Sequence, residues 1–295
     1  MRKKLTSAAF VTGLVVTVVF AQVSSGPPKG TLIITGGEFG TGVKERFVAL
    51  AGGADANFVY IPTASSGIKL DSGFIYRPPE SDSPAANTRE FEQELARIFG
   101  VKRITVLHTR DRNTANSEAF VEPLRKANGV WFSQGNAGRL ANAYLDTLTL
   151  REVQALLDRG GVVGGNSAGA IIHGSYIVRG RPDKPLLMAK GHERGFGFLK
   201  NVAINPHLTE AKRDAELVNV IDSYPELLGI GIDEKAALVV QGNQFEVIGD
   251  GRVAIYDNIK HGGEWYYWLT PGTTFDLRTR SVLRTPNAPK QEKRT

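Results

Sequence analysis

The chain has 295 residues, of which 41% are hydrophobic and 22% are charged. This length and composition predict one large globular domain or two modest ones, and they exclude a disordered chain, a collagen-like fibre and a multi-span membrane protein. The sequence has no cysteine, which excludes disulfides, thiolate metal sites and a cysteine nucleophile. The net charge of +6 falls to +3 without the three basic residues at 2–4, and to about +1 without the tail, so no nucleic-acid partner is expected.

The N-terminus has the pattern of a secretory signal peptide. Basic residues at 2–4 precede an apolar run at 8–20, and small residues near Ala21 fit a cleavage site. The run is short for a membrane-spanning helix of about 20 residues. We therefore expect a bacterial-type signal peptide at 1–21, export to the periplasm or the exterior, and no stable membrane insertion after cleavage. The division predicted for the remainder is a linker at 22–30, a single domain at 31–285 and a disordered tail at 286–295.

The body alternates short apolar runs with amphipathic ones. Strands are predicted at 31–35, 57–61, 103–107, 129–132 and 161–164. Helices are predicted at 45–51, 87–99, 117–127 and 137–158, with Ser117 as an N-cap and a break near Thr147. Apolar strands joined by helical crossovers predict an α/β fold, in which a mostly parallel sheet is flanked by helices on both faces.

The pattern changes after residue 207. A helix is predicted at 210–223, followed by closely spaced strands at 228–232, 236–241, 244–248 and 252–256. Gly-Asn and Asp-Gly pairs mark tight turns between them. We interpret these strands as an antiparallel C-terminal extension of the same sheet. A separate long segment, 64–86, is rich in Ser, Gly, Pro and Asp, and both a ligand-contacting loop and a tolerated surface insertion remain open for it.

One strand-to-helix turn concentrates the candidate chemistry. Residues 164–170 read Gly-Gly-Asn-Ser-Ala-Gly-Ala and contain Gly-x-Ser-x-Gly, the pattern of a nucleophile elbow. In such a turn Ser167 takes a strained backbone conformation that exposes its Oγ, and the flanking glycines avoid collisions with neighbouring strands. The free N–H groups at the start of the next helix suit a developing oxyanion. The turn therefore predicts Ser167 as a nucleophile.

A serine nucleophile needs a base, and the chain has five histidines. His207 follows a strand-like run at 201–205 and is expected at the same end of the sheet as Ser167. His108, at the end of the third predicted strand, is the next alternative. His173 lies six residues after Ser167, inside the predicted helix, where a packed side chain is the more common role.

The acid that would orient the base has two candidates. Asp233 and Glu234 close the predicted strand at 228–232, again at a strand end. The order along the chain is then serine, histidine, acid. No two histidines have the spacing of metal ligands, so no metal site is predicted.

Four segments resemble the cyanophycinase and dipeptidase E family of serine peptidases. Residues 165–170 are similar to its nucleophile segment Gly-x-Ser-Ala-Gly-Ala, and residues 229–234 to its Gly-x-Gly-x-Asp-Glu strand end. Residues 131–136 resemble its Phe-x-Gly-Gly-Asp/Asn segment, and His207 stands where its catalytic histidine falls. The likeness runs over about 31–256 and implies a flavodoxin-like, class I glutamine-amidotransferase-like fold.

The resemblance also implies roles for single residues. Ser167 would be the nucleophile, His207 the general base, and Glu234, rather than Asp233, the acid that orients it. The oxyanion hole would consist of backbone N–H groups, those of Ala168 and of Gly135 or Asn136. The family needs neither a metal nor an organic cofactor, so none is expected.

Other positions depart from the family pattern. Cyanophycinases follow the catalytic histidine with several arginines, whereas only Lys212 and Arg213 are basic here, and the family's substrate-contacting glutamine is replaced by Ala137. We therefore expect a short peptide or isopeptide with an acidic or small group rather than cyanophycin. Three residues are candidates for substrate binding, with the arginines as carboxylate clamps: Arg139, Arg213 and Asn166.

The function predicted from these features is that of an exported serine-type peptidase that works through an acyl-enzyme. An esterase is one alternative, because α/β-hydrolases share Gly-x-Ser-x-Gly. A secreted, non-catalytic binding protein on the same fold is another, which a buried Ser167 out of reach of His207 would favour. The lack of cysteine excludes a glutamine amidotransferase. The expected partner is a peptide or isopeptide substrate, and a homodimer is left open.

Overall fold

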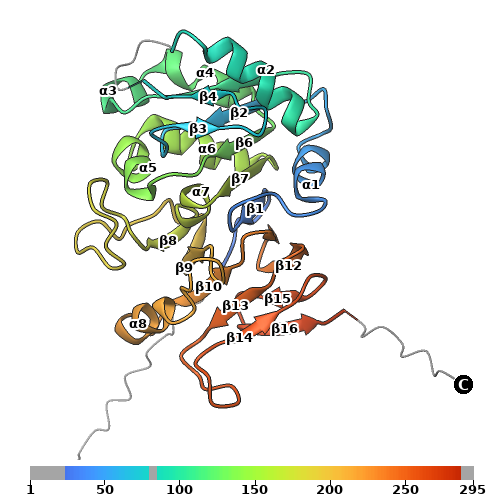
Figure 1. The fold of residues 1–295 in the computed structure, drawn as a ribbon, viewed down its shortest axis with the longest axis vertical. Coiled ribbons are helices and arrows are strands. Elements are labelled where there is room, and N and C mark those ends of the chain that lie inside the picture. Colours follow the sequence, from blue (N-terminus) through green and yellow to red (C-terminus); the bar gives the residue numbers. More distant parts are fainter. Residues whose placement is uncertain (1–23, 80–84, 287–295) are drawn as a thin grey trace, which may run out of the picture.

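The computed structural model describes residues 24–79 and 85–286. The predicted signal peptide at 1–21, nearly all of the predicted tail at 286–295 and part of the long segment 64–86 lie outside the described residues. Figure 1 shows parallel strands with their helices in blue to green, next to C-terminal strands in orange and red. The described strands form a nine-stranded sheet, a five-stranded sheet and a small hairpin.

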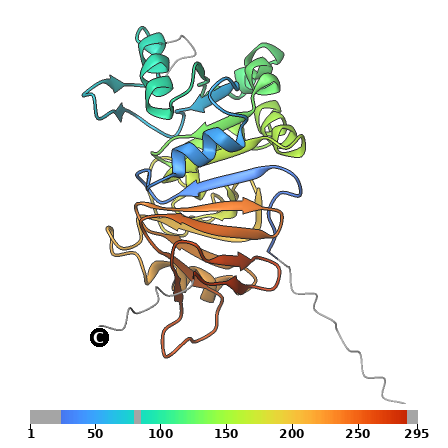
Figure 2. The same cartoon turned by 90° about the vertical axis from the view of Figure 1, so that its right-hand side faces the viewer.

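The nine-stranded sheet has a parallel half and an antiparallel half that meet at β1 (Thr31–Thr35). The parallel half continues from β1 through β7 (Val162–Asn166), β6 (Gly129–Phe132), β2 (Phe58–Ile61) and β5 (Ile104–Val106). The antiparallel half continues from β1 through β11 (Ala236–Gln241), β12 (Gln244–Gly249), β15 (Thr274–Asp276) and β16 (Ser281–Arg284). In Figure 2, β1 accordingly lies between green and orange strands. The predicted α/β fold with an antiparallel C-terminal extension is confirmed.

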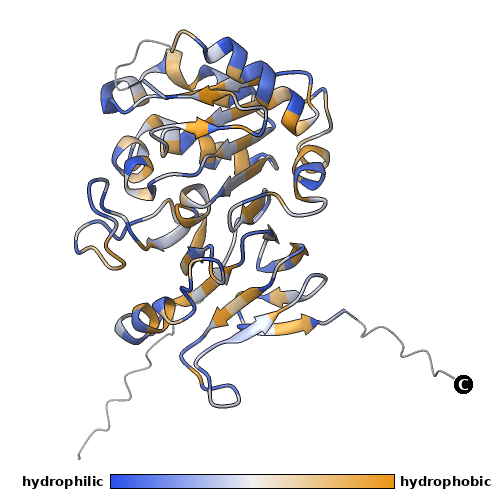
Figure 3. Cartoon of the chain, viewed as in Figure 1, coloured by the Kyte–Doolittle hydropathy of each residue, from blue (hydrophilic) through white to orange (hydrophobic). Residues whose placement is uncertain are grey.

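Helices cover both faces of this sheet because successive side chains of a strand point to opposite faces. On β1, Ile33 belongs to one apolar cluster, and Leu32 and Ile34 belong to another. The first cluster is closed by α1 (Val43–Leu50) and α2 (Thr88–Phe99). The second is closed by α3 (Arg112–Ala115), α4 (Glu118–Lys126), α5 (Ala137–Tyr144), α6 (Leu148–Asp158) and α7 (Ala168–Ile171). Figure 3 shows hydrophobic residues gathered on the strands and hydrophilic ones on the outer sides of the helices.

The C-terminal strands divide between two sheets, which the sequence interpretation did not foresee. β8 (Gly174–Ile177), β9 (Leu199–Pro206) and β10 (Leu228–Ile232) run parallel, and β13 (Val253–Tyr256) and β14 (Tyr267–Leu269) follow antiparallel. Strands 228–232 and 252–256 therefore do not extend the first sheet, and that part of the interpretation was wrong. The reason lies in the crossover helix α8 (Glu216–Ser223), which returns the chain in parallel beside β9.

One smaller expectation was wrong, and the structure adds detail to two other segments. The helix expected at 210–223 begins only at Glu216, because residues 207–215 form turns in which Lys212 has a positive φ of 53°. The described part of the predicted linker is packed against the body, with Ser25 paired to Lys200 and Ser24 fully buried. The segment 64–86 carries a hairpin of β3 (Ile68–Lys69) and β4 (Ile75–Tyr76). No helix in the described ranges is long and apolar enough to cross a membrane.

Candidate active site

Ser167 lies on a sharp turn between β7 and α7. Its backbone angles are φ 54° and ψ −111°, a conformation that costs free energy for a residue with a side chain and that recurs at functional sites. The glycines of the motif are required by close backbone contacts. A Cβ on Gly165 would lie 2.5 Å from the carbonyl oxygen of Gly169, and one on Gly169 would lie 2.1 Å from that of Phe132. The Gly-x-Ser-x-Gly pattern therefore folds here as a nucleophile elbow.

His207 follows directly after β9 and meets Ser167 across the two sheets. The Oγ of Ser167 lies 2.8 Å from Nε2 of His207, and Ser167 is half-buried rather than enclosed. Nδ1 of the same ring contacts a carboxylate oxygen of Glu234. With Nδ1–H donating to that carboxylate, Nε2 is left to accept the proton of the serine hydroxyl.

Asp233 and Glu234 follow the same strand, β10, but serve different partners. Oε1 of Glu234 accepts the backbone N–H of Glu38 at 3.1 Å, while Oε2 faces His207. Asp233 is buried and accepts from the backbone N–H and hydroxyl of Thr209 at 3.2 and 2.6 Å. It also accepts the backbone N–H of Arg252 at 3.2 Å. The carboxylate beside the imidazole is therefore that of Glu234, and Asp233 joins neighbouring turns together.

The structure reduces the number of backbone N–H groups that could form the oxyanion hole. The backbone N–H of Asn136 donates to the carbonyl of Ala64 at 2.9 Å, so it is not available to a substrate. Among the described residues no backbone hydrogen bond engages the N–H of Gly135, which borders the same cavity as Ser167. Gly135 has a φ of 139°, and a Cβ there would lie 2.2 Å from the oxygen of Ala64. The arrangement leaves Gly135 and Ala168 as the candidate donors.

The side chain of Asn136 has a structural role instead. Its Oδ1 accepts the N–H of Gly138 at 2.8 Å and so caps helix α5. Its Nδ2 donates to the carbonyl of Arg181 at 3.0 Å. These contacts connect the turn that carries Gly135 to the loop after β8, and they hold that turn in place.

Two cavities adjoin the serine turn. The first, of about 410 Å³, is lined by Ser167 together with Ser65, Ser66, Gly67, Gln134, Gly135, Asn136 and Arg139. The second, of about 520 Å³, lies beside Asn166 and Glu234 and is bordered by aromatic residues such as Phe39 and Trp131. Gln134 lines both cavities. Space for a substrate therefore adjoins the serine turn, both at Ser167 and beside Asn166.

The structure separates the three predicted substrate-binding residues. Arg139 lines the cavity with Ser167, and its guanidinium donates one long hydrogen bond to the carbonyl of Ala64 at 3.4 Å. Asn166 borders the second cavity, but its carboxamide accepts from the Trp131 indole at 3.2 Å and donates to the carbonyl of Gly37 at 3.1 Å. Both ends of this carboxamide are therefore engaged in holding the turn, and Asn166 is a weak candidate for substrate binding.

Arg213 lies apart from both cavities, in a partly buried polar cluster next to the end of β9. Its guanidinium is 4.0 Å from Glu216, which also pairs with Arg179. Arg179 in turn donates to Oδ1 of Asn205 at 2.8 Å. Burial, with a smaller contribution from Arg179, lowers the pKa of Arg213 from its usual value. The geometry does not bring this arginine to the serine.

The other candidate bases lie elsewhere. His108 contacts the hydroxyl of Thr63 at 2.9 Å and the carbonyl of Pro79 at 2.8 Å. His173 is fully buried beneath Ser167, and burial lowers its pKa to about 4. Within the described ranges no group of three or more His, Asp or Glu side chains could hold a metal ion.

Sequence reasoning missed the segment that supports the acid. A Cβ on Gly37 would lie 1.9 Å from Oε1 of Glu234, so the carboxylate fits only because residue 37 is glycine. The next residue, Glu38, supplies the N–H that holds that oxygen. The Gly-Gly pair at the end of β1 was a visible signal, since glycines at a strand end allow close approach of another group.

Comparison with known proteins places this chain in a family. The model of peptidase family S51 matches residues 32–248, which include Ser167, His207 and Glu234. The chain belongs to peptidase family S51. It is therefore a serine-type peptidase, a hydrolase.

This S51 peptidase is similar to known proteins both in sequence and in fold. It is 29% identical over 233 residues to a cyanophycinase of Geminocystis herdmanii, covering 77% of this chain and 79% of the relative. A cyanophycinase of a Nostoc species is 27% identical over 280 residues, or 85% and 87% of the two chains. The crystal structure of a peptidase from an acI-B1 actinobacterium superposes with a TM-score of 0.61 at 25% identity, over 85% of this chain and 98% of that one.

Proposed function

We propose that this chain is an exported S51 peptidase that hydrolyses a peptide or isopeptide bond in short peptides through Ser167, His207 and Glu234. The observation that carries the proposal is the continuous contact from the Ser167 hydroxyl through the His207 ring to the Glu234 carboxylate, on a strained turn beside open cavities. Export rests on the N-terminal sequence pattern alone.

Each step of the reaction has a residue to perform it. His207 Nε2 takes the proton of Ser167 Oγ as that oxygen attacks the scissile carbonyl. The N–H groups of Ala168 and Gly135 receive the negative charge that develops on the carbonyl oxygen. His207 then protonates the leaving amine, and a water molecule activated by the same ring releases the acyl group. Glu234 keeps Nδ1 protonated and stabilises the imidazolium that forms in each half-reaction.

We further propose that the substrate carries a carboxylate near the scissile bond, as an aspartyl peptide does. Among the described residues that line the cavity shared with Ser167, Arg139 alone is charged. Its guanidinium is only weakly engaged by the carbonyl of Ala64, at 3.4 Å, and can bind a carboxylate bidentately. The relatives are named cyanophycinases. Because Arg213 is held by Glu216 apart from both cavities, we propose short carboxylate-bearing peptides rather than cyanophycin as substrates of this chain.

A buried Ser167 out of reach of His207 would have favoured the alternative of a non-catalytic binding protein. The contact of 2.8 Å and the open cavities argue against it. An esterase would need neither a leaving amine nor a charged group in the cavity. Comparing the hydrolysis of esters and peptides distinguishes it from the proposed peptidase.

The test is hydrolysis by the mature protein, starting near Gln22, of α- and β-aspartyl dipeptides, cyanophycin and a simple ester. Ser167→Ala is the matched control, since it removes one oxygen and leaves the turn intact. Serine-dependent cleavage of an aspartyl peptide supports the proposal. Turnover of the ester alone, or of cyanophycin in preference to dipeptides, contradicts the proposed substrate. No turnover of any substrate by well-folded protein contradicts the proposed catalytic role.

A further inference from the structure

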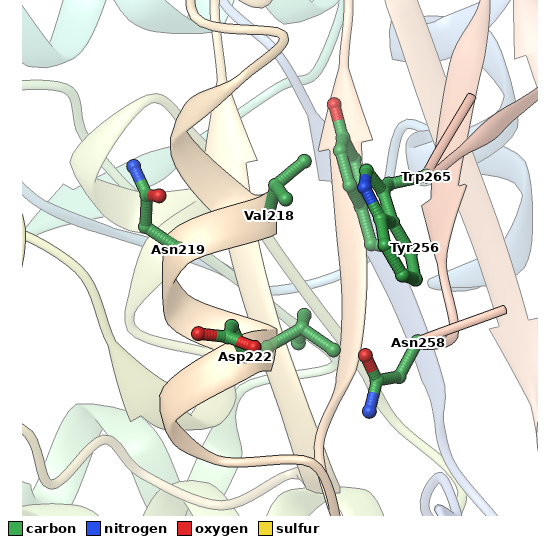
Figure 4. A pocket seen from close by; sticks show the side chains of 7 residues that line it. Val218, Asn219, Asp222, Tyr256, Asn258 and Trp265 are labelled. Atoms are coloured by element: carbon green, nitrogen blue, oxygen red, sulfur yellow. The ribbon is translucent and has the colours of Figure 1, made fainter. Parts of the chain in front are cut away.

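A separate cavity of about 210 Å³ opens beside the second sheet, and Ser167, His207 and Glu234 are not among the residues that line it. It lies between helix α8 and the residues that follow β13. Figure 4 shows Val218 and Asp222 on the helix at one side, with Tyr256, Asn258 and Trp265 at the other. Asn219 and Ile221 complete the lining. The volume is below the roughly 300–1,000 Å³ of sites for drug-sized molecules, so it suits a single small ring.

This cavity is distinct from the candidate active site. In the antiparallel pair of β10 and β13, Tyr256 lies opposite Gly229, at the start of β10, and Val253 lies opposite Ile232, at its end. Glu234 follows the end of β10, whereas the cavity adjoins Tyr256 at the other end. A ligand bound here would therefore not touch the catalytic residues.

The walls of the cavity are preformed. The hydroxyl of Tyr256 donates to the carbonyl of Asp214 at 2.9 Å, and its ring packs on Tyr266 with centroids 5.1 Å apart. The loop that carries Trp265 is closed by a backbone hydrogen bond of 2.8 Å from His261 to Glu264. Rigid walls reduce the entropy that a ligand must overcome on binding.

The lining is amphipathic. Val218, Ile221 and the ring of Tyr256 form an apolar floor, and Trp265 is a half-exposed aromatic wall, 42% accessible. The side chains of Asp222 and Asn258 have no hydrogen-bond partner among the described residues, and both are exposed at the rim. A matching ligand needs an apolar face for the aromatic wall and hydroxyl or amide groups for the rim.

Charge then separates a neutral ligand from a cation. An aromatic wall with one carboxylate could also bind an ammonium group through a cation–π contact. Here, however, the ammonium of Lys260 already lies 4.9 Å from the centre of the Trp265 ring. Its charge offsets that of Asp222, the only charged residue among the seven described residues that line the cavity. The combination favours a neutral, hydroxyl-rich ring.

We propose that the cavity between α8 and Trp265 is a binding site for a neutral pyranose sugar. The C–H face of the sugar ring lies on Trp265, and its hydroxyl groups bind Asp222 and Asn258. Pyranose rings combine an apolar C–H face with a rim of donors and acceptors, which is the pattern that the lining requires.

The test is a fluorescence titration of the mature protein with N-acetylglucosamine and with methyl β-glucoside. Of the three tryptophans, Trp131 is buried, so Trp265 and Trp268 dominate the response to ligand. Trp268→Phe assigns the signal to Trp265. We expect saturable binding of at least one sugar, with a Kd of about 1–10 mM, and unchanged peptidase activity in every variant.

Three variants define the contacts. Trp265→Ala is expected to weaken binding at least about tenfold, whereas Trp265→Phe, which keeps an aromatic face, is expected to weaken it only about two- to threefold. Asn258 has a positive φ of 64°, so Asn258→Gly removes the carboxamide while keeping the backbone conformation; it is expected to weaken binding about fivefold. Isothermal titration calorimetry gives the affinities where the tryptophan signal is lost.

Several results would overturn the proposal. No saturable change with either sugar up to about 100 mM contradicts it, since such binding would be weaker than any specific site requires. Binding that is unchanged in Trp265→Ala shows that the sugar lies elsewhere. Binding of ethylammonium in place of the sugars, with the same dependence on Trp265, makes the cavity a cation site. Unchanged melting temperatures of the variants rule out loss of fold as the cause of weaker binding.

Discussion

Glu234 contacts Nδ1 of His207 from the end of the strand that runs parallel to the histidine's own. The two residues follow β10 and β9, so adjacent parallel strands of the second sheet deliver the acid and the base together. Ser167 comes from β7 of the first sheet. The candidate triad thus forms where the carboxyl ends of the strands of two sheets meet, and its geometry depends on how those sheets pack.

The two neighbouring acids after β10 are expected to respond differently to neutralisation. Glu234→Gln should lower kcat by about 10³- to 10⁴-fold with little loss of stability, because the ring of His207 loses the carboxylate that fixes its tautomer. Asp233→Asn should lower the unfolding free energy by about 1–3 kcal/mol, because it weakens bonds to Thr209 and Arg252, and should change kcat much less. Kinetics and thermal unfolding of both variants check this. The reverse pattern, at intact stability, would make Asp233 the orienting acid.

Arg139 and Arg213 form a second matched pair. Arg139→Met should raise KM for a carboxylate-bearing peptide by about 10- to 100-fold, because a charged hydrogen bond to the substrate is lost. Hydrolysis of a neutral ester should be nearly unchanged. Arg213→Met should leave KM within about twofold, since this arginine contacts Glu216 and the carbonyl of Pro206 rather than the cavity. Equal effects of both substitutions on KM would contradict the proposed clamp.

Gly135 is expected to contribute its backbone N–H to the reaction. Gly135→Ala should lower kcat by about 10²- to 10³-fold, because the added Cβ meets the oxygen of Ala64 and displaces the donor. Asn136→Ala is the comparison: it removes a helix cap, worth about 1 kcal/mol of stability, and loosens the same turn, but it adds no atom beside Ala64 and should lower kcat much less than Gly135→Ala does. Steady-state kinetics at saturating substrate give the kcat of both variants for this comparison. A Gly135→Ala enzyme with normal kcat would move the oxyanion hole elsewhere.

The buried His173 predicts a dependence of stability on pH. Its pKa is lowered by burial from 6.5 to about 4, so between these values the unfolded chain binds a proton that the folded chain does not. Stability should therefore rise with pH from about 4 to 6.5. Across that window His173 should increase the unfolding free energy by about 3 kcal/mol. Urea unfolding at pH 4.5 and 7.5 of wild-type protein and of His173→Met measures this. An equal pH slope in the two proteins would contradict the prediction.

The elbow could be predicted from the sequence because its chemistry is local. Gly-x-Ser-x-Gly between an apolar strand and a helix requires close backbone contacts, and those contacts occur around Gly165 and Gly169. The strands and helices of the parallel half were likewise close to the predicted ranges, since their side-chain periodicity reflects burial on one or both faces.

Features that depend on distant contacts could not be predicted in the same way. The helix expected at 210–223 begins only at Glu216, after turns that include Lys212 at positive φ, and Thr209 in those turns bonds to Asp233, 24 residues away along the chain. The division of the C-terminal strands into two sheets depends on whether each strand pairs with β1 or with β9, and both kinds of strand are similarly apolar. The loss of Asn136 as an oxyanion donor likewise depends on Ala64, in another loop.

A Ser167 hydroxyl activated by His207 should react as a nucleophile. The most direct test is mass spectrometry of the mature protein after treatment with a fluorophosphonate, which reacts with activated serines. We expect a single adduct on the peptide that contains Ser167, absent in Ser167→Ala and formed at least about 10²-fold more slowly in His207→Ala. An adduct on a different serine, or equal labelling with and without His207, would contradict it.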